Sequence, residues 1–359
     1  MFLYQSDKNA IRILGCRSYD GEVIIPETID GKPVTELAPY AFSEGWGRRE
    51  MLAAAGSEIF LADSEGNPLP VHQPEAGESE AGASQMELPL PPPACCGHLT
   101  EIILPKTIKK IGNYAFYNCF ELKSIRCYSS IADVGSGLFT GCTGVRNLDI
   151  HIVKGQKSCF KELISELRQE LYVNYYSDEG QAKLIFPEMY EESVENTPAR
   201  IIVREMHGCG HRYRYCFEQT DFRFQKYDEL FPHILVQEPE SVTAALVMGR
   251  LRFPVGLMEK YREVYETYLR EHFAGAAKAA IRERKAETAT GEEFGATAGP
   301  VSAQEMQLPY WLADRYGDTR ERLDTVIELA NEEKLPELLS FLMDLKHRRF
   351  AVKKRTFSL

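Results

Sequence analysis

The chain of 359 residues lacks long apolar runs, an excess of positive charge and any leader-like start. No apolar run approaches the ~20 residues that a membrane-spanning helix needs. The net charge of −11 argues against a protein that binds nucleic acid over its whole surface. The first ten residues contain neither a basic nor a sustained apolar segment, so no secretory signal is predicted. We therefore expect a cytoplasmic globular protein without a membrane span.

Cysteine is scarce for a disulfide-stabilised protein. The nine cysteines are an odd number and are spread thinly along the chain. Disulfide scaffolds are short and dense in cysteine. The pattern favours reduced thiols, which agrees with a cytoplasmic location.

The common sequence signatures of catalysis are also missing. The chain contains no H-E-x-x-H, no G-x-S-x-G and no Rossmann glycine fingerprint. Gly135-x-Gly137 has no following Gly-Lys-Ser/Thr and lies inside a repeat, which favours a turn over a phosphate loop. Glu191, Glu192 and Glu195 are interpreted as a solvated charged surface and not as general acids or bases. No enzymatic activity and no cofactor is predicted.

The most informative feature that is present is a 23-residue repeat. The apolar motif occurs three times, as Leu99-x-x-Ile102-x-Leu104, Leu122-x-x-Ile125-x-Cys127 and Val145-x-x-Leu148-x-Ile150. In phase with it, Ala115-Phe116-x-x-Cys119 recurs as Leu138-Phe139-x-x-Cys142. A fixed period of this length indicates stacked supersecondary units. Cysteine packs as a small apolar residue, so Cys119 and Cys142 are predicted to lie in the core.

Two stretches carry a resemblance to a known family. The runs VIIPETIDGKPVTELAPYAF (23–42) and LTEIILPKTIKKIGNYAFYNCFELKSI (99–125) resemble leucine-rich repeats of the BspA-like bacterial subclass. The resemblance covers residues 11–150 with one interruption and implies a repeat stack that takes part in protein–protein recognition. Ser129 and Leu138 depart from the pattern in the third unit, so the stack is expected to end near Ile150.

The polar positions between the apolar ones predict a surface. In each strand they point away from the core, and stacking aligns them into columns. The two predicted columns are Glu101–Ser124–Asn147 and Ile103–Arg126–Asp149, extended by Glu22 and Ile24. We interpret these columns as a partner-binding surface, which suits a protein better than a polyanion. The alternative is a face that is only solvated.

The whole chain is predicted to have a mixed α/β fold with three parts. A short BspA-like leucine-rich-repeat solenoid occupies 1–155, with a flexible insertion at about 44–97. A capping helix and a small β-containing module occupy 156–236, and an α-helical domain with a loose linker at about 286–306 occupies 237–359.

Periodicity and turn residues predict individual elements. The expected strands are Glu58–Ala62 and Leu69–Val71 as a hairpin, then Tyr172–Tyr176, Ala182–Phe186, Ile201–Val203 and Tyr213–Phe217. The expected helices are 157–171, 241–251, 257–285, 319–332 and 336–347, the last two resembling an ankyrin-type helix pair.

One group of residues suggests metal binding. His207-x-Cys209-x-His211 and Cys216 place four ligands that zinc prefers within ten residues. Gly208 and Gly210 favour the alternative, a glycine-rich turn with incidental His and Cys. A metal-binding or enzymatic module within 172–236 is therefore the rival to a non-enzymatic scaffold protein.

The end of the chain is basic in an acidic protein. The segment 346–355 contains Lys346, Arg348, Arg349, Lys353, Lys354 and Arg355. It is the one candidate for contact with nucleic acid or an anionic membrane surface. Basic residues near a helix C-terminus also complement the helix dipole, and that interpretation is preferred.

Overall fold

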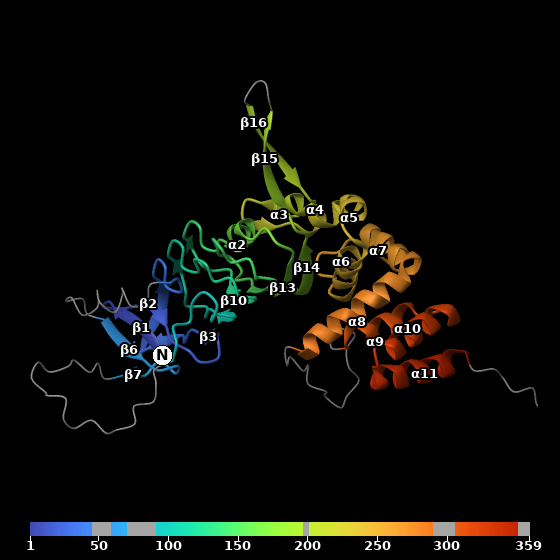
Figure 1. The fold of residues 1–359 in the computed structure, drawn as a ribbon, viewed down its shortest axis with the longest axis horizontal. Coiled ribbons are helices and arrows are strands. Elements are labelled where there is room, and N and C mark those ends of the chain that lie inside the picture. Colours follow the sequence, from blue (N-terminus) through green and yellow to red (C-terminus); the bar gives the residue numbers. More distant parts are fainter. Residues whose placement is uncertain (45–58, 70–90, 197–200, 290–305, 351–359) are drawn as a thin grey trace, which may run out of the picture. The chain divides into compact units, whose positions relative to one another are not determined.

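The computed structural model describes residues 1–44, 59–69, 91–196, 201–289 and 306–350. The chain forms two compact units, one of Met1–Glu179 with Phe186–Arg223 and one of Gly180–Ile185 with Phe224–Leu359 (Figure 1). Most of the predicted insertion and linker, and the end of the basic segment, lie outside the described residues. The three-part division at 155 and 236 stays a prediction.

The core of unit 1 is a parallel sheet built from the repeat. Its strands lie in the order β13-β12-β10-β8-β3. They are β3 (Glu22–Ile24), β8 (Glu101–Ile103), β10 (Ser124–Tyr128), β12 (Asn147–His151) and β13 (Leu171–Ser177). The apolar residues Ile102, Ile125, Leu148 and Val173 are register partners and are all buried. The 23-residue period therefore fixes which side chains form the core.

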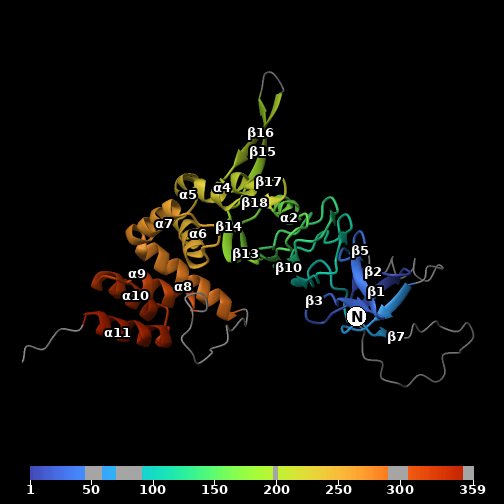
Figure 2. The same ribbon diagram turned by 180° about the vertical axis from the view of Figure 1, so that it is seen from behind.

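A second sheet contains strands from the first three turns of the stack, whereas the turns of β12 and β13 contribute none to it. Its order is β11-β9-β5-β2-β1-β6-β7, with β4 paired to β5. Figure 2 shows β1, β2, β5 and β7 of this sheet. The strands are β1 (Phe2–Ser6), β2 (Ile11–Cys16), β4 (Thr28–Ile29), β5 (Lys32–Leu37), β6 (Ile59–Ala62), β7 (Pro68–Leu69), β9 (Lys110–Ile111) and β11 (Asp133–Val134). The segment 11–42 thus belongs to the stack, because β3 pairs with β8 and β5 pairs with β9. The predicted hairpin is confirmed as β6 and β7, whereas Glu58 and Val71 of the prediction lie outside the described residues.

Stacked phenylalanines and thiols fill the turns. The rings of Phe42, Phe116 and Phe139 stack with centroids 5.3 and 5.7 Å apart. The Sγ of Cys119 donates to the Phe42 carbonyl at 3.1 Å, and that of Cys142 donates to the Phe116 carbonyl at 2.9 Å. Both thiols are buried, so their predicted core position is confirmed.

The stack does not end at Ile150. Strand β13 pairs with β12 over five residues, from Asn147↔Tyr172 to His151↔Tyr176. The helix α2 (Phe160–Glu166) lies in the chain between these strands and is shorter than the predicted 157–171. It occupies a turn of the stack and does not cap its end. The 23-residue period did not predict this turn, because Tyr172 lies 25 residues after its register partner Asn147.

The rest of unit 1 follows the stack. A hairpin of β15 (Tyr190–Asn196) and β16 (Ile201–His207) precedes α3 (Gly210–Arg214), and β17 (Phe217–Glu218) pairs with β18 (Asp221–Phe222). The predicted strand Tyr213–Phe217 is wrong, because Tyr213 and Arg214 lie in α3. The Arg214 side chain is buried there and bonds only backbone carbonyls, an environment that strand periodicity does not reveal.

Unit 2 is helical apart from β14 (Gly180–Phe186, of which Phe186 belongs to unit 1). The helices are α4 (Phe224–Glu229), α5 (Phe231–Gln237), α6 (Glu240–Arg252), α7 (Glu259–Glu271), α8 (Phe273–Ala289), α9 (Leu308–Tyr316), α10 (Arg320–Glu332) and α11 (Pro336–Phe350). The predicted helices at 241–251, 319–332 and 336–347 are confirmed as α6, α10 and α11. The prediction of a single helix over 257–285 is wrong, because α7 ends at Glu271 and α8 begins at Phe273. His272 lies between the two helices, and its Nδ1 is 3.1 Å from the Glu240 carboxylate.

A buried ion pair links three helices of unit 2. The Arg250 guanidinium donates to both carboxylate oxygens of Asp228, at 2.9 and 3.0 Å. The Tyr265 hydroxyl donates to the same carboxylate at 2.9 Å. Asp228 and Arg250 are fully buried, so this bidentate pair fixes α4, α6 and α7 to one another.

Candidate partner-binding surface

The predicted columns are aligned on the outer side of the parallel sheet. The register places Glu22, Glu101, Ser124, Asn147 and Tyr172 side by side on successive strands. It likewise places Ile24, Ile103, Arg126, Asp149 and Asn174 in a second column. A third column consists of Tyr128, His151 and Tyr176. We use the name "sheet face" for the surface that the three columns form. Each predicted column gains one residue from β13.

Arg126 lies at the centre of this face between two carboxylates. Its Nε is 3.3 Å from Asp149 Oδ2 and its Nη2 is 3.8 Å from Glu101 Oε1. The Asn174 amide donates to the other Asp149 oxygen at 2.7 Å. The Arg126 side chain is 43% exposed, against 23% for Glu101 and 17% for Asp149. These contacts order polar side chains across four neighbouring strands.

An aromatic column completes the sheet face. Tyr128, His151 and Tyr176 are register partners, and their rings stack with centroids 5.0 and 4.6 Å apart. The pKa of His151 is lowered, chiefly by burial and also by Arg126, while Asp149 acts in the opposite direction. Sequence reasoning missed this column because it considered only two outward positions per strand. The recurrence of an aromatic ring directly after the last buried residue of β10 and of β12 was the available signal.

The repeat in this region is also found by comparison with known families. Residues 94–176 match the family described as BspA type Leucine rich repeat region (6 copies). These residues are a BspA-type leucine-rich repeat segment. No curated protein and no solved structure matches the chain. The match extends past Ile150 to the end of β13, so the repeat is longer at its C-terminal end than the 11–150 of the sequence-based resemblance.

The four candidate metal ligands do not converge. Cys209 and Cys216 are buried, and the Cys216 thiol donates to the Arg212 carbonyl at 3.6 Å. His207 Nε2 is 3.1 Å from Glu192, and His211 Nδ1 is 3.0 Å from the Gly208 carbonyl. Within the described ranges, no three His, Cys, Asp or Glu side chains are arranged to hold a metal ion.

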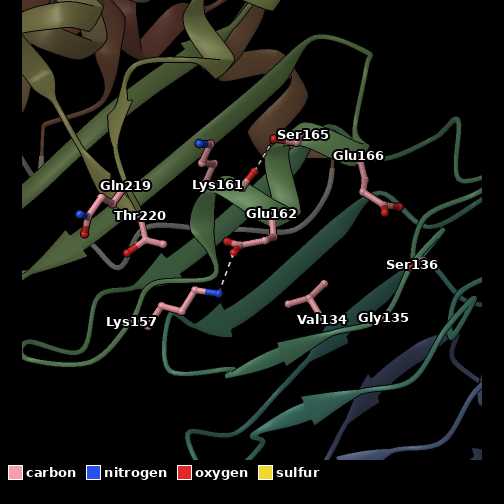
Figure 3. A pocket seen from close by; sticks show the side chains of 10 residues that line it. All are labelled: Val134, Gly135, Ser136, Lys157, Lys161, Glu162, Ser165, Glu166, Gln219 and Thr220. Carbon is pink, nitrogen blue, oxygen red and sulfur yellow. Dashed lines mark hydrogen bonds and ion pairs between the residues drawn. The ribbon is translucent and has the colours of Figure 1, made fainter.

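A surface pocket lies beside α2 in unit 1 (Figure 3). Ten residues line it: Val134, Gly135, Ser136, Lys157, Lys161, Glu162, Ser165, Glu166, Gln219 and Thr220. Its carboxylates already have partners. Glu162 is 3.1 Å from Lys157, and Glu166 accepts the Gly137 and Phe139 amides at 3.1 and 3.4 Å. Glu166 therefore joins α2 to the preceding turn.

The described residues of the basic segment form ion pairs and hydrogen bonds within unit 2. Lys346 pairs with Asp324, and Arg348 lies 2.9 Å from Asp344. Arg349 donates to the carbonyls of Ala313 and Gly317 at the end of α9. Arg349 thus binds the carbonyl end of α9, while Lys353, Lys354 and Arg355 lie outside the described residues and the role of the basic segment stays a prediction. No helix in the described residues is long and apolar enough to cross a membrane.

Proposed function

We propose that this chain is a non-enzymatic scaffold protein of the cytoplasm that binds a protein partner through the sheet face of its BspA-type repeat segment. The observation that carries the proposal is the alignment of polar and aromatic side chains in three columns across the parallel strands. BspA-type repeats are protein-interaction modules, which supports binding as the mode of action. Seven of the nine cysteines are buried thiols, which supports a reducing compartment.

The composition of the sheet face favours a protein over a small ligand. Protein interfaces are enriched in Tyr and Arg, and such residues dominate the binding energy when they lie centrally. Tyr128 and Tyr176 supply such side chains on the sheet face, and Arg126 orders the carboxylates beside them. The contacts of Arg126 with Asp149 and Glu101 hold these two carboxylates in one orientation before binding, which lowers the entropic cost of association.

A charge swap at the centre of the face tests the proposal. The tagged full chain and an Arg126→Glu/Asp149→Lys variant would each capture partners separately from the cytoplasmic and the remaining fractions of the host. The swap preserves an ion pair between the two positions but exchanges the places of the positive and the negative charge that a partner would meet. We expect the partner to be lost from the variant, and to bind the wild-type chain directly when purified.

The second sheet offers a matched control. Lys110 and Asp133 are 3.7 Å apart on neighbouring turns, with the same spacing in the chain as Arg126 and Asp149. A Lys110→Glu/Asp133→Lys variant should retain the partner. Equal capture by all three proteins, or capture only from a non-cytoplasmic fraction, would contradict the proposal.

A further inference from the structure

We infer that the partner segment recognised by the sheet face is basic, with Lys or Arg side chains that pair with Glu101 and Asp149. This inference rests on the proposed function and specifies the chemistry of the partner. Charge complementarity across an interface governs specificity and the rate of association more than area does.

The charges within the columns are unbalanced. Glu22, Glu101 and Asp149 contribute carboxylates, whereas Arg126 is the one cation. Glu22 and Glu101 are register partners on neighbouring strands, an arrangement in which like charges are unfavourable. This column contains two carboxylates and no cation, so an incoming cation would offset its negative charge.

The charge of Arg126 is already used within the protein. Its Nε lies 3.3 Å from Asp149, and both neighbouring turns supply it with a carboxylate. An acidic partner would have to compete with these two groups at short range. A basic partner instead adds a cation to columns that contain three carboxylates and one arginine.

The aromatic column is compatible with the same partner. Tyr128 and Tyr176 border the charged column, and the face of a tyrosine ring attracts a Lys or Arg side chain. The lowered pKa of His151 keeps that side chain from adding positive charge at neutral pH. The net charge of −11 on the whole chain also attracts a basic segment over longer distances.

A random dodecapeptide library displayed on phage provides the probe. It would be selected on the immobilised full chain, and the recovered peptides would be synthesised for calorimetry. We expect enrichment in Lys and Arg and affinities that fall as salt rises. Glu101→Gln/Asp149→Asn should weaken binding about ten-fold, the effect of ~1.4 kcal/mol.

The direction in which Arg126→Gln changes peptide affinity distinguishes a basic partner from an acidic one. Removal of the internal cation exposes both carboxylates, so basic peptides should bind about three-fold more tightly, whereas acidic peptides would bind less tightly. Lys110→Gln is the matched control, because Lys110 also lies between two carboxylates, Glu36 at 3.8 Å and Asp133 at 3.7 Å, but on the other sheet. It should leave binding unchanged.

The outcomes separate the two hypotheses. The inference of a basic partner is overturned if the selected peptides are acidic and no longer bind Arg126→Gln. It is also overturned if the selection shows no enrichment in Lys and Arg. In both cases the capture experiment still decides the proposed function. Peptides that bind the wild type and every sheet-face variant equally overturn both, because the binding surface then lies elsewhere.

Discussion

At the scale of single residues, two buried arginines are stabilised in different ways. Arg250 is paired with the Asp228 carboxylate, whereas Arg214 donates to the carbonyls of five residues. These carbonyls belong to Ile164, Leu167, Gln169, Pro187 and Gly210. Burial lowers the pKa of Arg214 to about 10. Its guanidinium therefore joins the end of α2 to α3, and all five acceptors of these bonds are backbone carbonyls and not carboxylates.

Buried thiols make stability depend on pH. Burial raises the pKa of Cys159 to about 12, while an unfolded thiol titrates near ~8.5. The folded state therefore binds more protons above pH ~8.5, so this contribution to stability is complete below that pH and is lost as pH rises toward 12. Cys159→Ala should make the free energy of unfolding fall less steeply between pH 9 and 10.5, by up to about 1.4 kcal/mol per pH unit.

Urea denaturation at several pH values measures this slope. Ser158→Ala is the control, because Ser158 is a buried neighbour that does not titrate. An unchanged slope in Cys159→Ala would show that the thiol is solvated in the folded protein.

At the scale of elements, the turns of the stack approach most closely at glycine. A Cβ atom at Gly135 would lie 2.4 Å from the Asn113 backbone nitrogen, and one at Gly112 would lie 2.3 Å from that of Pro39. These glycines are 23 residues apart and follow β9 and β11. The repeat therefore requires glycine here because backbone of the preceding turn occupies the space of a side chain. Gly135-x-Gly137 is confirmed as part of a turn.

Gly135→Ala should separate two turns of the stack. We expect a loss of about 2–3 kcal/mol, as for other overpacked sites, measured by urea denaturation of unit 1. Gly155→Ala is the control, because Gly155 has a φ of +76° but nothing within 4 Å of an added Cβ. It should lose only about 1 kcal/mol from backbone strain. Equal losses would mean that the turns can move apart at Gly135 without cost.

Elements with a strong period were predictable, and elements set by contacts were not. The strands at Ile102, Ile125 and Leu148 follow from alternation within the repeat. Helix α10 follows from its apolar stripe and from Thr319, whose hydroxyl accepts the Arg322 amide at 3.3 Å. The break at His272 has no such signal, because apolar residues continue at helical spacing on both sides of it.

At the scale of the whole molecule, the two units should respond separately to mutation. Asp228→Ala leaves the Arg250 guanidinium buried without its carboxylate, which should cost unit 2 about 3–5 kcal/mol. Hydrogen exchange followed by mass spectrometry should show faster exchange in peptides from α4, α6 and α7, and unchanged exchange in β8, β10 and β12.

Tyr265→Phe is the milder comparison for this prediction. It removes one hydrogen bond to Asp228 and should cost about 1 kcal/mol. Faster exchange throughout both units in Asp228→Ala would instead indicate that the chain unfolds as a single cooperative body.

The sequence by itself determined the repeat, its buried residues and two of the three columns on the sheet face. A regular period encodes these directly, since each residue's position in the repeat fixes its position in the stack. Only the tertiary structure decided that β13 adds a strand, that Tyr128, His151 and Tyr176 stack, and that the four candidate metal ligands stay apart. These features depend on the spacing of residues in three dimensions, which an irregular segment of sequence does not specify.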